Sequence, residues 1–284
     1  MYTKEQLSKY PYFEEVFQSG DASNVVDSLT GLVSRRYMVE FIQHLVDNRV
    51  PFTLALLDLD NFKFINDTYG HKIGDGVLAG MSGDLERYLE DYGVSHLDMV
   101  IATHPHADHI GGMPSVLERF SVGEFIMSFM PEDATPTTKT YLRMLELLDE
   151  KNIPVKEAVV GDVYELGTAR LQILGPIEET DDKNDMSVVT RLTFGDRAFL
   201  FTGDAESGVE KQLVNSGYDL SADVLKLGHH GSKTSSSSVF LKRVSPQCVI
   251  ATCGADNDYG HPHREGLQRL DAMDITLYRA DVSG

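Results

Sequence analysis

The sequence predicts an α/β protein in which layers of helices cover mixed β-sheets. Two observations support this class. From about residue 97 onward, short apolar stretches of strand length alternate with stretches whose apolar residues recur at helical spacing. Histidines and aspartates also follow directly after several of these predicted strands, as expected where strand ends build a site. The chain has 284 residues, enough for one large domain or two smaller ones.

The composition limits the classes of partner. The net charge is −19, whereas extended binding of nucleic acid depends on Lys and Arg side chains that neutralise phosphates. A small phosphate-bearing substrate, or nucleic acid held locally by metal ions, remains compatible with this charge. The sequence shows no secretory apolar region and no apolar run of membrane-spanning length, so we expect a cytoplasmic protein with no membrane partner. Cys248 and Cys253 are expected in the core.

The N-terminal segment has its own pattern of elements. Asp27 or Ser28 can cap a helix that runs to about residue 48. The stretch PFTLALLDL (51–59) is almost continuously apolar, as a buried strand is, and it includes Asp58 near its end. A second helix is predicted from about residue 75 to residue 92.

The rest of the chain alternates between strands and helices. Predicted strands cover residues 97–103, 123–128, 153–159, 169–174, 188–194, 197–202, 222–227, 247–252 and 274–279. Predicted helices cover residues 113–120, 137–151, 205–216 and 263–272.

The stretch THPHADHIGG (103–112) predicts a metal site. It places His104, His106, Asp108 and His109 directly after a predicted strand. Imidazole suits zinc, iron and manganese, and an added carboxylate suits a pair of such ions. A loop that leaves the end of a strand can fold all four side chains around one point.

Three later stretches expose residues of the same kind after apolar strands. Asp204 follows AFLFTG, His229 and His230 follow ADVLKLG, and CVIATCGADNDYGHPH contains His261 and His263. Seven of the ten histidines therefore lie in three loops that can meet at one site.

The motifs HPHADH, FTGD, LGHHGSKTSSS and NDYGHPH, in this order, resemble the metallo-β-lactamase fold. Most specifically they resemble the hydrolase domain of late-competence DNA-uptake proteins of the ComEC type. The resemblance covers roughly residues 85–284. It implies an αββα sandwich with a dinuclear metal centre between the sheets.

The resemblance implies six ligands for two ions, with one carboxylate shared. They are His104 and His106 for the first ion, Asp108, His109 and His229 for the second, and Asp204 as the bridge. The choice between His229 and His230 stays open; His229 is preferred because it comes first after the strand.

The same resemblance implies hydrolysis of a phosphodiester, such as single-stranded DNA, by a metal-activated water. The expected cofactor is Zn²⁺ or Mn²⁺, one or two ions per chain. Catalytic roles fall to Asp108 and His261, and substrate-binding roles to His230, Ser232 and Lys233. The serine run 235–238 is interpreted as a plain flexible loop.

Two departures from the family pattern qualify this expectation. No histidine occurs between His109 and His229, where many relatives supply a third ligand to the first ion. The stretch NDMSVV (184–189) resembles the competence-type variant of that region, and a weakly held or absent first ion is the alternative. Upstream, only about ten residues (YLEDYGVSHLD, 88–98) resemble the several strands that normally precede the histidine motif.

Residues 24–80 resemble the first half of a GGDEF diguanylate cyclase domain instead. DSLTGLVSRRYMVEF and LLDLDNFKFINDTYGHKIGD carry the resemblance, and Asp58, Asn66 and Asp75 occupy its metal-binding and guanine-contacting positions. The GGDEF hairpin itself is missing, so cyclase activity and a Mg²⁺ ion at Asp58 are not expected.

We therefore predict two parts: a truncated GGDEF-like segment (1–84) and a metallo-β-lactamase-like domain (85–284) whose first strands that segment replaces. In this hypothesis strand 51–59 lies parallel to strand 97–102 through a right-handed crossover. The alternative is an inactive chimeric protein, or a regulatory one whose cyclase half still binds a guanine nucleotide. A recombinant, a natural fusion and a faulty gene model all stay open as origins.

Overall fold

The structure, a computed structural model, describes residue 89 and residues 94–254, 257 and 259–280. Several predictions therefore lie outside the described residues. They are the helix from Asp27 or Ser28, the strand 51–59 and its pairing, most of the helix 75–92, the boundary between residues 84 and 85, and the positions of Asp58, Asn66 and Asp75. Within that second helix, Leu89 is helical and buried, and it packs against Val116 and Phe120.

The first sheet has three parallel strands in the order β1-β2-β3. Parallel neighbours need a crossover connection, and helices supply it here. The strands are β1 (His96–Ala102), β2 (Ser121–Met127) and β3 (Val155–Glu157). The connections carry α6 (Ala107–Ile110), α7 (Met113–Arg119), the short helix η2 (Glu132–Ala134) and α8 (Lys139–Glu150).

The second sheet is mixed and has seven strands in the order β10-β9-β8-β7-β6-β5-β4. The antiparallel part is β4 (Val163–Leu166), β5 (Ala169–Gly175), β6 (Val189–Phe194) and β7 (Arg197–Phe201). The strands β8 (Val224–Lys226), β9 (Cys248–Ala251) and β10 (Thr276–Arg279) continue the sheet parallel to β7. The intervening helices are α9 (Ser207–Asn215), η3 (Gly228–Gly231), α10 (Ser238–Val244) and α11 (Arg264–Asp271).

The strands alternate between two cores, because successive side chains of a strand point to opposite faces. Met99, Ile101 and Ile126 of the first sheet pack against Leu171 and Ile173 of the second. On the other face of the first sheet, side chains of β1 and β2 pack with α7 and α8. This outer core includes Val100, Phe125, Met127, Leu117, Met144 and Leu147.

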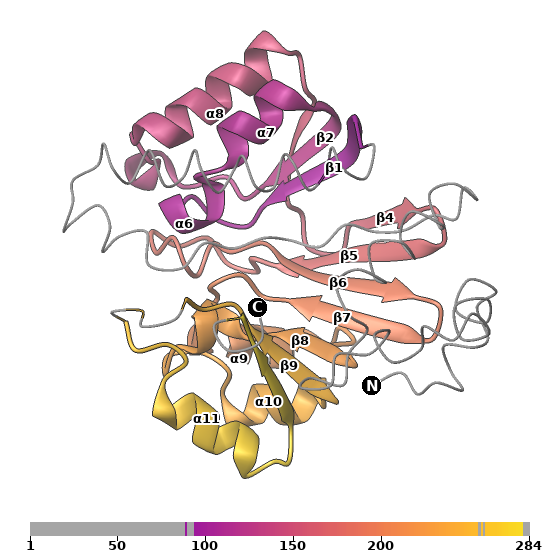
Figure 1. Cartoon of the computed structure of the whole chain (residues 1–284), viewed down its shortest axis with the longest axis vertical. Helices are drawn as coiled ribbons and strands as arrows, with labels where there is room; N and C mark the ends of the chain where they lie inside the picture. The colour runs from indigo at the N-terminus through magenta and orange to yellow at the C-terminus, as the bar shows by residue number, and fades with distance from the viewer. Residues whose placement is uncertain (1–88, 90–93, 255–256, 258, 281–284) are drawn as a thin grey trace, which may run out of the picture. The chain divides into compact units, whose positions relative to one another are not determined.

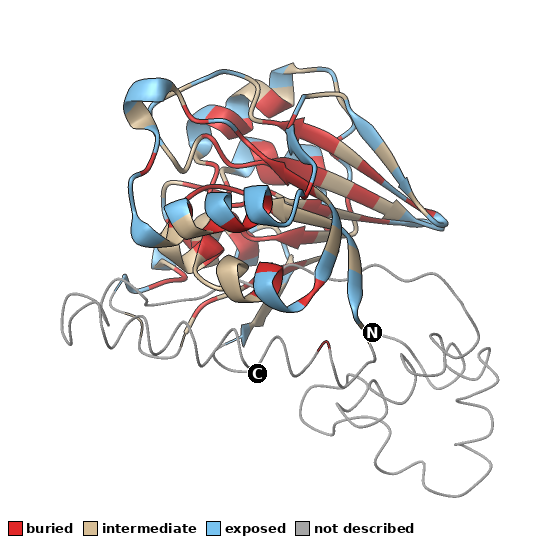
Figure 2. Cartoon of the chain, turned by 90° about the horizontal axis from the view of Figure 1, so that it is seen from above, coloured by how far each residue is buried: buried red, intermediate tan, exposed pale blue. Residues whose placement is uncertain are grey.

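A third core lies between the second sheet and α9, α10 and α11. Its strand residues include Leu200, Leu225 and Val249, and its helix residues include Leu213, Phe240, Leu241 and Leu270. Figure 1 shows the resulting order of layers, and Figure 2 shows buried residues on the strands and on the helix faces turned toward them. The predicted αββα sandwich is therefore confirmed for the described residues between 94 and 280.

Every strand and helix predicted from residue 97 onward is present, but five further elements were not predicted: α6, η2, β4, η3 and α10. The serine run shows why. Ser235 and Ser236 are buried, and the Ser237 hydroxyl caps α10 by accepting a hydrogen bond from the Phe240 N–H. The interpretation of this run as a flexible loop was wrong, because the buried Glu210 carboxylate on α9 accepts hydrogen bonds from two of its backbone N–H groups.

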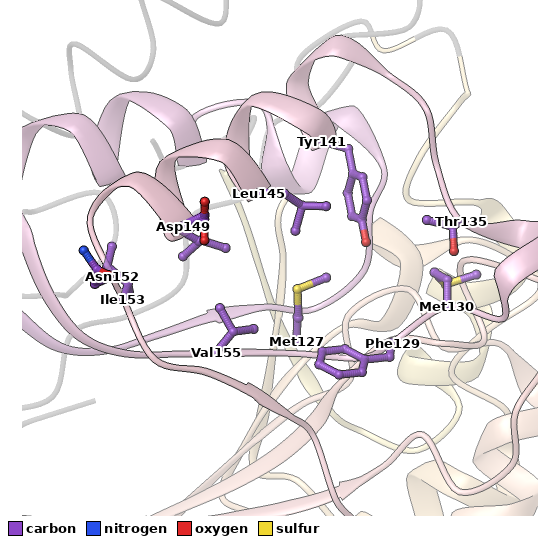
Figure 3. A pocket seen from close by; sticks show the side chains of 11 residues that line it. Met127, Phe129, Met130, Thr135, Tyr141, Leu145, Asp149, Asn152, Ile153 and Val155 are labelled. Atoms are coloured by element: carbon purple, nitrogen blue, oxygen red, sulfur yellow. The ribbon is translucent and has the colours of Figure 1, made fainter.

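One cavity lies beside α8, between the helix and the loop that follows β2 (Figure 3). It measures about 710 Å³, and Phe129, Tyr141, Leu145 and Val155 are among its lining residues. None of the histidines of the motif loops lines it, so this cavity is not part of the histidine cluster. The helix α8, with 12 residues, is far shorter than the ~20 residues of a bilayer span, and no described helix qualifies as one.

Candidate metal centre

The histidine motif begins where β1 ends, at the edge where the two sheets meet. The Thr103 carbonyl accepts a hydrogen bond of 2.8 Å from the Val188 N–H, directly before β6 of the second sheet. His104 and the extended residue His106 follow, and one helical turn, α6, then carries Asp108 and His109. The strand end and the first turn of α6 therefore direct four potential ligands toward the second sheet.

Asp204 comes from the second sheet, just after β7. A tight turn holds it, with Gly203 at φ +52° and the Ala205 N–H bonded to the Thr202 carbonyl. A Cβ on residue 203 would come within 2.8 Å of the Ser187 side chain. Glycine is therefore required here both by the positive φ and by the lack of space. The turn leaves the Asp204 carboxylate facing the loop that follows β1.

The two adjacent histidines after β8 occupy an unusual backbone conformation. His229 (φ 46°) and His230 (φ 54°) both lie in the left-handed region, and Gly231 follows at φ +86°. Such a conformation costs on the order of 1–3 kcal/mol for each residue that is not glycine, and it persists where the surroundings enforce it. His230 Nδ1 donates a hydrogen bond of 2.9 Å to the Thr252 carbonyl, which turns Nε2 toward the Asp204 carboxylate.

The first potential ligand group contains His104, His106 and Asp204. His104 Nε2 lies 3.1 Å from His106 Nδ1 and 3.7 Å from Asp204 Oδ2. One ligand atom from each of the three residues lies within 4.8 Å of the others. His104 and Asp204 are buried and His106 is half-buried, so His106 is the most exposed member of the group.

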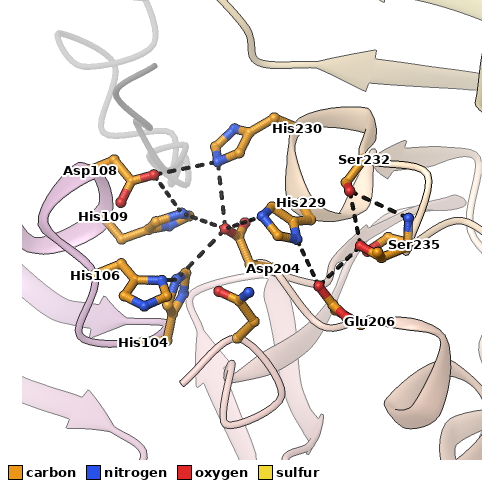
Figure 4. Close-up of polar contacts among 12 residues, drawn as sticks. His104, His106, Asp108, His109, Asp204, Glu206, His229, His230, Ser232 and Ser235 are labelled. Carbon is orange, nitrogen blue, oxygen red and sulfur yellow. Dashed lines mark hydrogen bonds and ion pairs between the residues drawn. The ribbon is translucent and has the colours of Figure 1, made fainter. Parts of the chain in front are cut away.

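The second group contains Asp108, His109, Asp204 and His230, again with ligand atoms within 4.8 Å of one another. Asp204 Oδ2 lies 3.2 Å from His109 Nε2 and 3.6 Å from His230 Nε2. Asp108 Oδ2 closes the group at 3.7 Å from His230 Nε2. Asp204 thus belongs to both groups and stands at their centre, as Figure 4 shows.

The geometry favours His230 over His229 in the second group, contrary to the preference drawn from the sequence. His229 Nδ1 lies 3.2 Å from Glu206 Oε1, and its Nε2 is 3.8 Å from Asp204 Oδ2. The left-handed turn is the physical reason, because it turns the second histidine inward and leaves the first at the opening. The side chain of His229 is 23% exposed, against 5% for His230.

Both groups fit a divalent cation. Asp204 is 2% exposed, and its Oδ1 has no hydrogen-bond donor among the described residues, a costly arrangement for a carboxylate. Burial alone would raise the pKa of Asp204, but His109 and His230 together hold this pKa well below its usual range. Burial, followed by the charge of His109, lowers the pKa of His104 well below its ordinary value. An ionised Asp204 beside a neutral His104 provides donors of the kind that a metal ion requires.

Ser187 is a site residue that the sequence analysis missed. Its hydroxyl accepts a hydrogen bond of 2.9 Å from the Asp204 N–H and lies 3.2 Å from His104 Nδ1. It therefore orients one residue of each sheet from within the stretch NDMSVV. The sequence singles out this stretch because no third histidine occurs in it, but the serine is identified only by its contacts with His104 and Asp204.

The remaining predicted residues surround the opening of the cluster. The His261 ring is centred 5.7 Å from that of His229 and 6.0 Å from that of His230. Burial, followed by His263 and His230, lowers the pKa of His261 to about 4. Lys233 is exposed and its N–H donates to His263 Nδ1, whereas Ser232 is buried and its hydroxyl bonds that of Thr234.

A sandwich of two sheets between helices, with histidines and aspartates gathered at strand ends from both sheets, is the arrangement of a metal-dependent hydrolase. The family comparison agrees: residues 79–252 match the metallo-beta-lactamase superfamily, and the chain belongs to this family. Residues 24–96 match a second family, the diguanylate cyclase GGDEF domain. The two matches overlap at residues 79–96.

Similar proteins come from both families. ComE operon protein 3 of Bacillus subtilis is 31% identical over 198 residues, which cover 69% of this chain and 25% of that protein. Competence protein ComA of Neisseria gonorrhoeae is 32% identical over 211 residues, 74% of this chain and 28% of the relative. The response regulator PleD of Caulobacter vibrioides is 42% identical over 82 residues, 26% of this chain and 18% of that protein. The chain thus spans about a quarter of the length of the competence relatives.

Proposed function

We propose that this protein is a phosphodiesterase of the nuclease type that uses two divalent ions, Zn²⁺ or Mn²⁺. The observation that carries the proposal is the shared position of Asp204 in two groups of potential ligands. His104, His106 and Asp204 would hold the first ion, and Asp108, His109, Asp204 and His230 the second. Two such ions would activate a water molecule and stabilise the charge that develops on a phosphate.

The residues at the opening would then handle the substrate. His229, whose Nδ1 lies 3.2 Å from Glu206 Oε1, has a side chain that is 23% exposed and can meet the substrate. His261, whose low pKa keeps the imidazole neutral near pH 7, donates a hydrogen bond to a phosphate oxygen or the leaving group. Lys233 supplies an exposed positive charge for the phosphate, and Ser232 fixes the loop that carries it.

Nucleic acid is the substrate class that the relatives favour. Their names refer to competence and, for a Haemophilus influenzae relative that is 29% identical over 232 residues, to recombination. A net charge of −19 argues against tight binding of long duplex DNA, since 44 acidic side chains outnumber the 25 Lys and Arg that could neutralise phosphates. We therefore propose a short stretch of single-stranded DNA, held mainly through the ions, as the substrate.

The test is hydrolysis of end-labelled single-stranded DNA by the full chain loaded with Mn²⁺ or Zn²⁺. We expect release of short products, and we expect Asp204→Asn to lower the rate at least about 100-fold because it weakens both groups. Metal content per chain is measured on the same samples. A wild-type chain that binds two ions and cleaves no phosphodiester would refute the proposal.

The match to the cyclase family supports a second candidate, a guanine-nucleotide-binding or inactive chimeric protein. Cyclase activity itself is not expected, because the sequence lacks the GGDEF hairpin. Calorimetric titration of the full chain with GTP tests this candidate. Binding that Asn66→Ala abolishes would support it, and the absence of heat would remove it.

A further inference from the structure

A row of aromatic rings connects the metal centre with the solvent. The Tyr259 and His261 rings are stacked with centroids 5.5 Å apart and planes inclined by 21°. The His261 and His230 rings continue the row at 6.0 Å and 18°. Exposure falls along it from 44% at Tyr259 to 9% at His261 and 4% at His230. The outer ring is thus half in solvent, and the inner ring belongs to the second ligand group.

Neighbouring residues hold His261 in this row through a hydrogen bond and a ring contact. The Asn257 side chain accepts a hydrogen bond of 2.7 Å from the His261 N–H, which anchors the loop beneath the rings. His263 meets His261 edge to face at 4.7 Å, and its Nδ1 accepts the N–H of Lys233 at 2.9 Å. The exposed ring of Tyr259 is therefore linked through His261 and His263 to the backbone of Lys233, whose residue is also exposed.

We propose that Tyr259 is a stacking platform for the nucleobase next to the scissile phosphate. The inference rests on the proposed function and narrows its substrate class to nucleotides, as opposed to phosphodiesters with small alkyl groups. A base has a flat apolar face that stacks on an aromatic side chain whatever its sequence, and such stacking suits a single strand. A base on the outer face of Tyr259 extends the row of rings, while its phosphate reaches toward Lys233 and the ions.

Equilibrium binding tests this role independently of hydrolysis. The probes are fluorescein-labelled tetrathymidylate and an abasic tetramer of equal charge, both with phosphorothioate linkages that slow cleavage. We expect the metal-loaded wild-type chain to bind the thymidylate about 5- to 100-fold more tightly, as measured by anisotropy. Tyr259→Leu should reduce this ratio to about one, and Tyr259→Phe should preserve it.

The matched control is Phe194→Leu, which removes another aromatic ring of equal exposure, 44%. Phe194 lies at the hairpin between β6 and β7, at the opposite end of β7 from Asp204, so its loss should leave the ratio unchanged. Metal content is compared across all variants. A wild-type chain without base preference, or a Tyr259→Leu variant that keeps its preference, would overturn the inference.

Turnover of two p-nitrophenyl phosphodiesters separates this inference from the proposed function. One carries thymidine as its second group and the other carries methyl, so both lose the same leaving group. We expect Tyr259→Leu to lower kcat/KM about 5-fold or more for the thymidine ester and less than about 2-fold for the methyl ester. Equal losses on both esters would contradict the stacking role, whereas failure of the wild-type chain to hydrolyse either would contradict only the proposed hydrolysis.

Discussion

His229 and His230 are adjacent in sequence and yet lie in different surroundings. His230 is buried between two carboxylates, and its other ring nitrogen is fixed by the Thr252 carbonyl. His229 is at the opening. There, Glu206 Oε1 accepts one hydrogen bond from the His229 ring and another from the Thr234 hydroxyl. A backbone in the left-handed region at both positions produces this division, which the sequence alone left open.

This difference predicts opposite effects of two neighbouring substitutions. His230→Ala should remove about one equivalent of metal per chain, because it deletes a buried member of the second group. His229→Ala should retain both equivalents while lowering phosphodiester hydrolysis. Metal content measured by mass spectrometry on dialysed protein checks this, with hydrolysis measured in parallel. Loss of metal in His229→Ala alone would restore the original preference for His229 as the ligand.

Among the elements, β7, β8 and β9 are joined at one end by Asp223. Its carboxylate accepts hydrogen bonds from the Ala198 N–H at 2.8 Å and the Gln247 side chain at 2.8 Å, and it pairs with Arg197 at 2.9 Å. The hydrogen bond from Ala198, followed by Arg197, lowers the pKa of Asp223 despite partial burial. Asp223 thus stabilises the junction, inside the sheet, where the antiparallel part becomes parallel.

The lowered pKa of Asp223 predicts a pH-dependent contribution to stability. A carboxyl whose pKa is lower in the folded state stabilises the fold above its unfolded pKa of ~3.9, and this contribution fades as the pH falls through the folded pKa. We expect Asp223→Asn to lower the free energy of unfolding by about 1–2 kcal/mol at pH 7. The difference from wild type should shrink below about pH 4.

Urea denaturation of both proteins between pH 3 and pH 7 measures this difference. Asp196→Asn, at an exposed position of the β6–β7 hairpin, is the matched control and should change stability by less than about 0.5 kcal/mol. A deficit in Asp223→Asn that stays constant down to pH 3 would show that its ionisation does not contribute.

Most elements could be predicted because their signals are local. The strands β1, β2, β5, β6, β7, β8 and β9 are formed by apolar runs that are buried on one or both faces. The local composition alone therefore reveals them. Two of the elements that the sequence did not reveal lack a strong local signal, for different reasons. The helix α10 follows a serine run that Glu210 orders from 26 residues away in sequence, and β4 is an edge strand with a single neighbour, β5.

At the scale of the whole molecule, the candidate centre draws its ligands from both sheets. His104, His106, Asp108 and His109 follow β1, whereas Asp204 and His230 follow strands of the second sheet. The Ser187 hydroxyl and the bond from Val188 to Thr103 already link the two sides. An ion bound to both sides should therefore strengthen the contact between the sheets.

Removal of metal should accordingly destabilise the domain. With free metal at about 100 times its dissociation constant, ligand linkage stabilises the folded state by about 2.7 kcal/mol. We expect a chelator to lower the Tm of the wild-type chain by several degrees, as measured by calorimetry. Asp204→Asn should show a much smaller shift under the same conditions. Equal shifts in both proteins would mean that the chelated metal lies elsewhere.

The sequence by itself determined the family, the two-sheet architecture and the four loops that carry the histidines and aspartates. These features are written in local patterns: apolar runs of strand length, and polar motifs placed directly after them. The tertiary structure decided which of two adjacent histidines turns inward, that Ser187 supports both His104 and Asp204, and that Tyr259 ends a row of rings. These depend on backbone dihedral angles and on contacts between residues far apart in the chain, which no local pattern encodes.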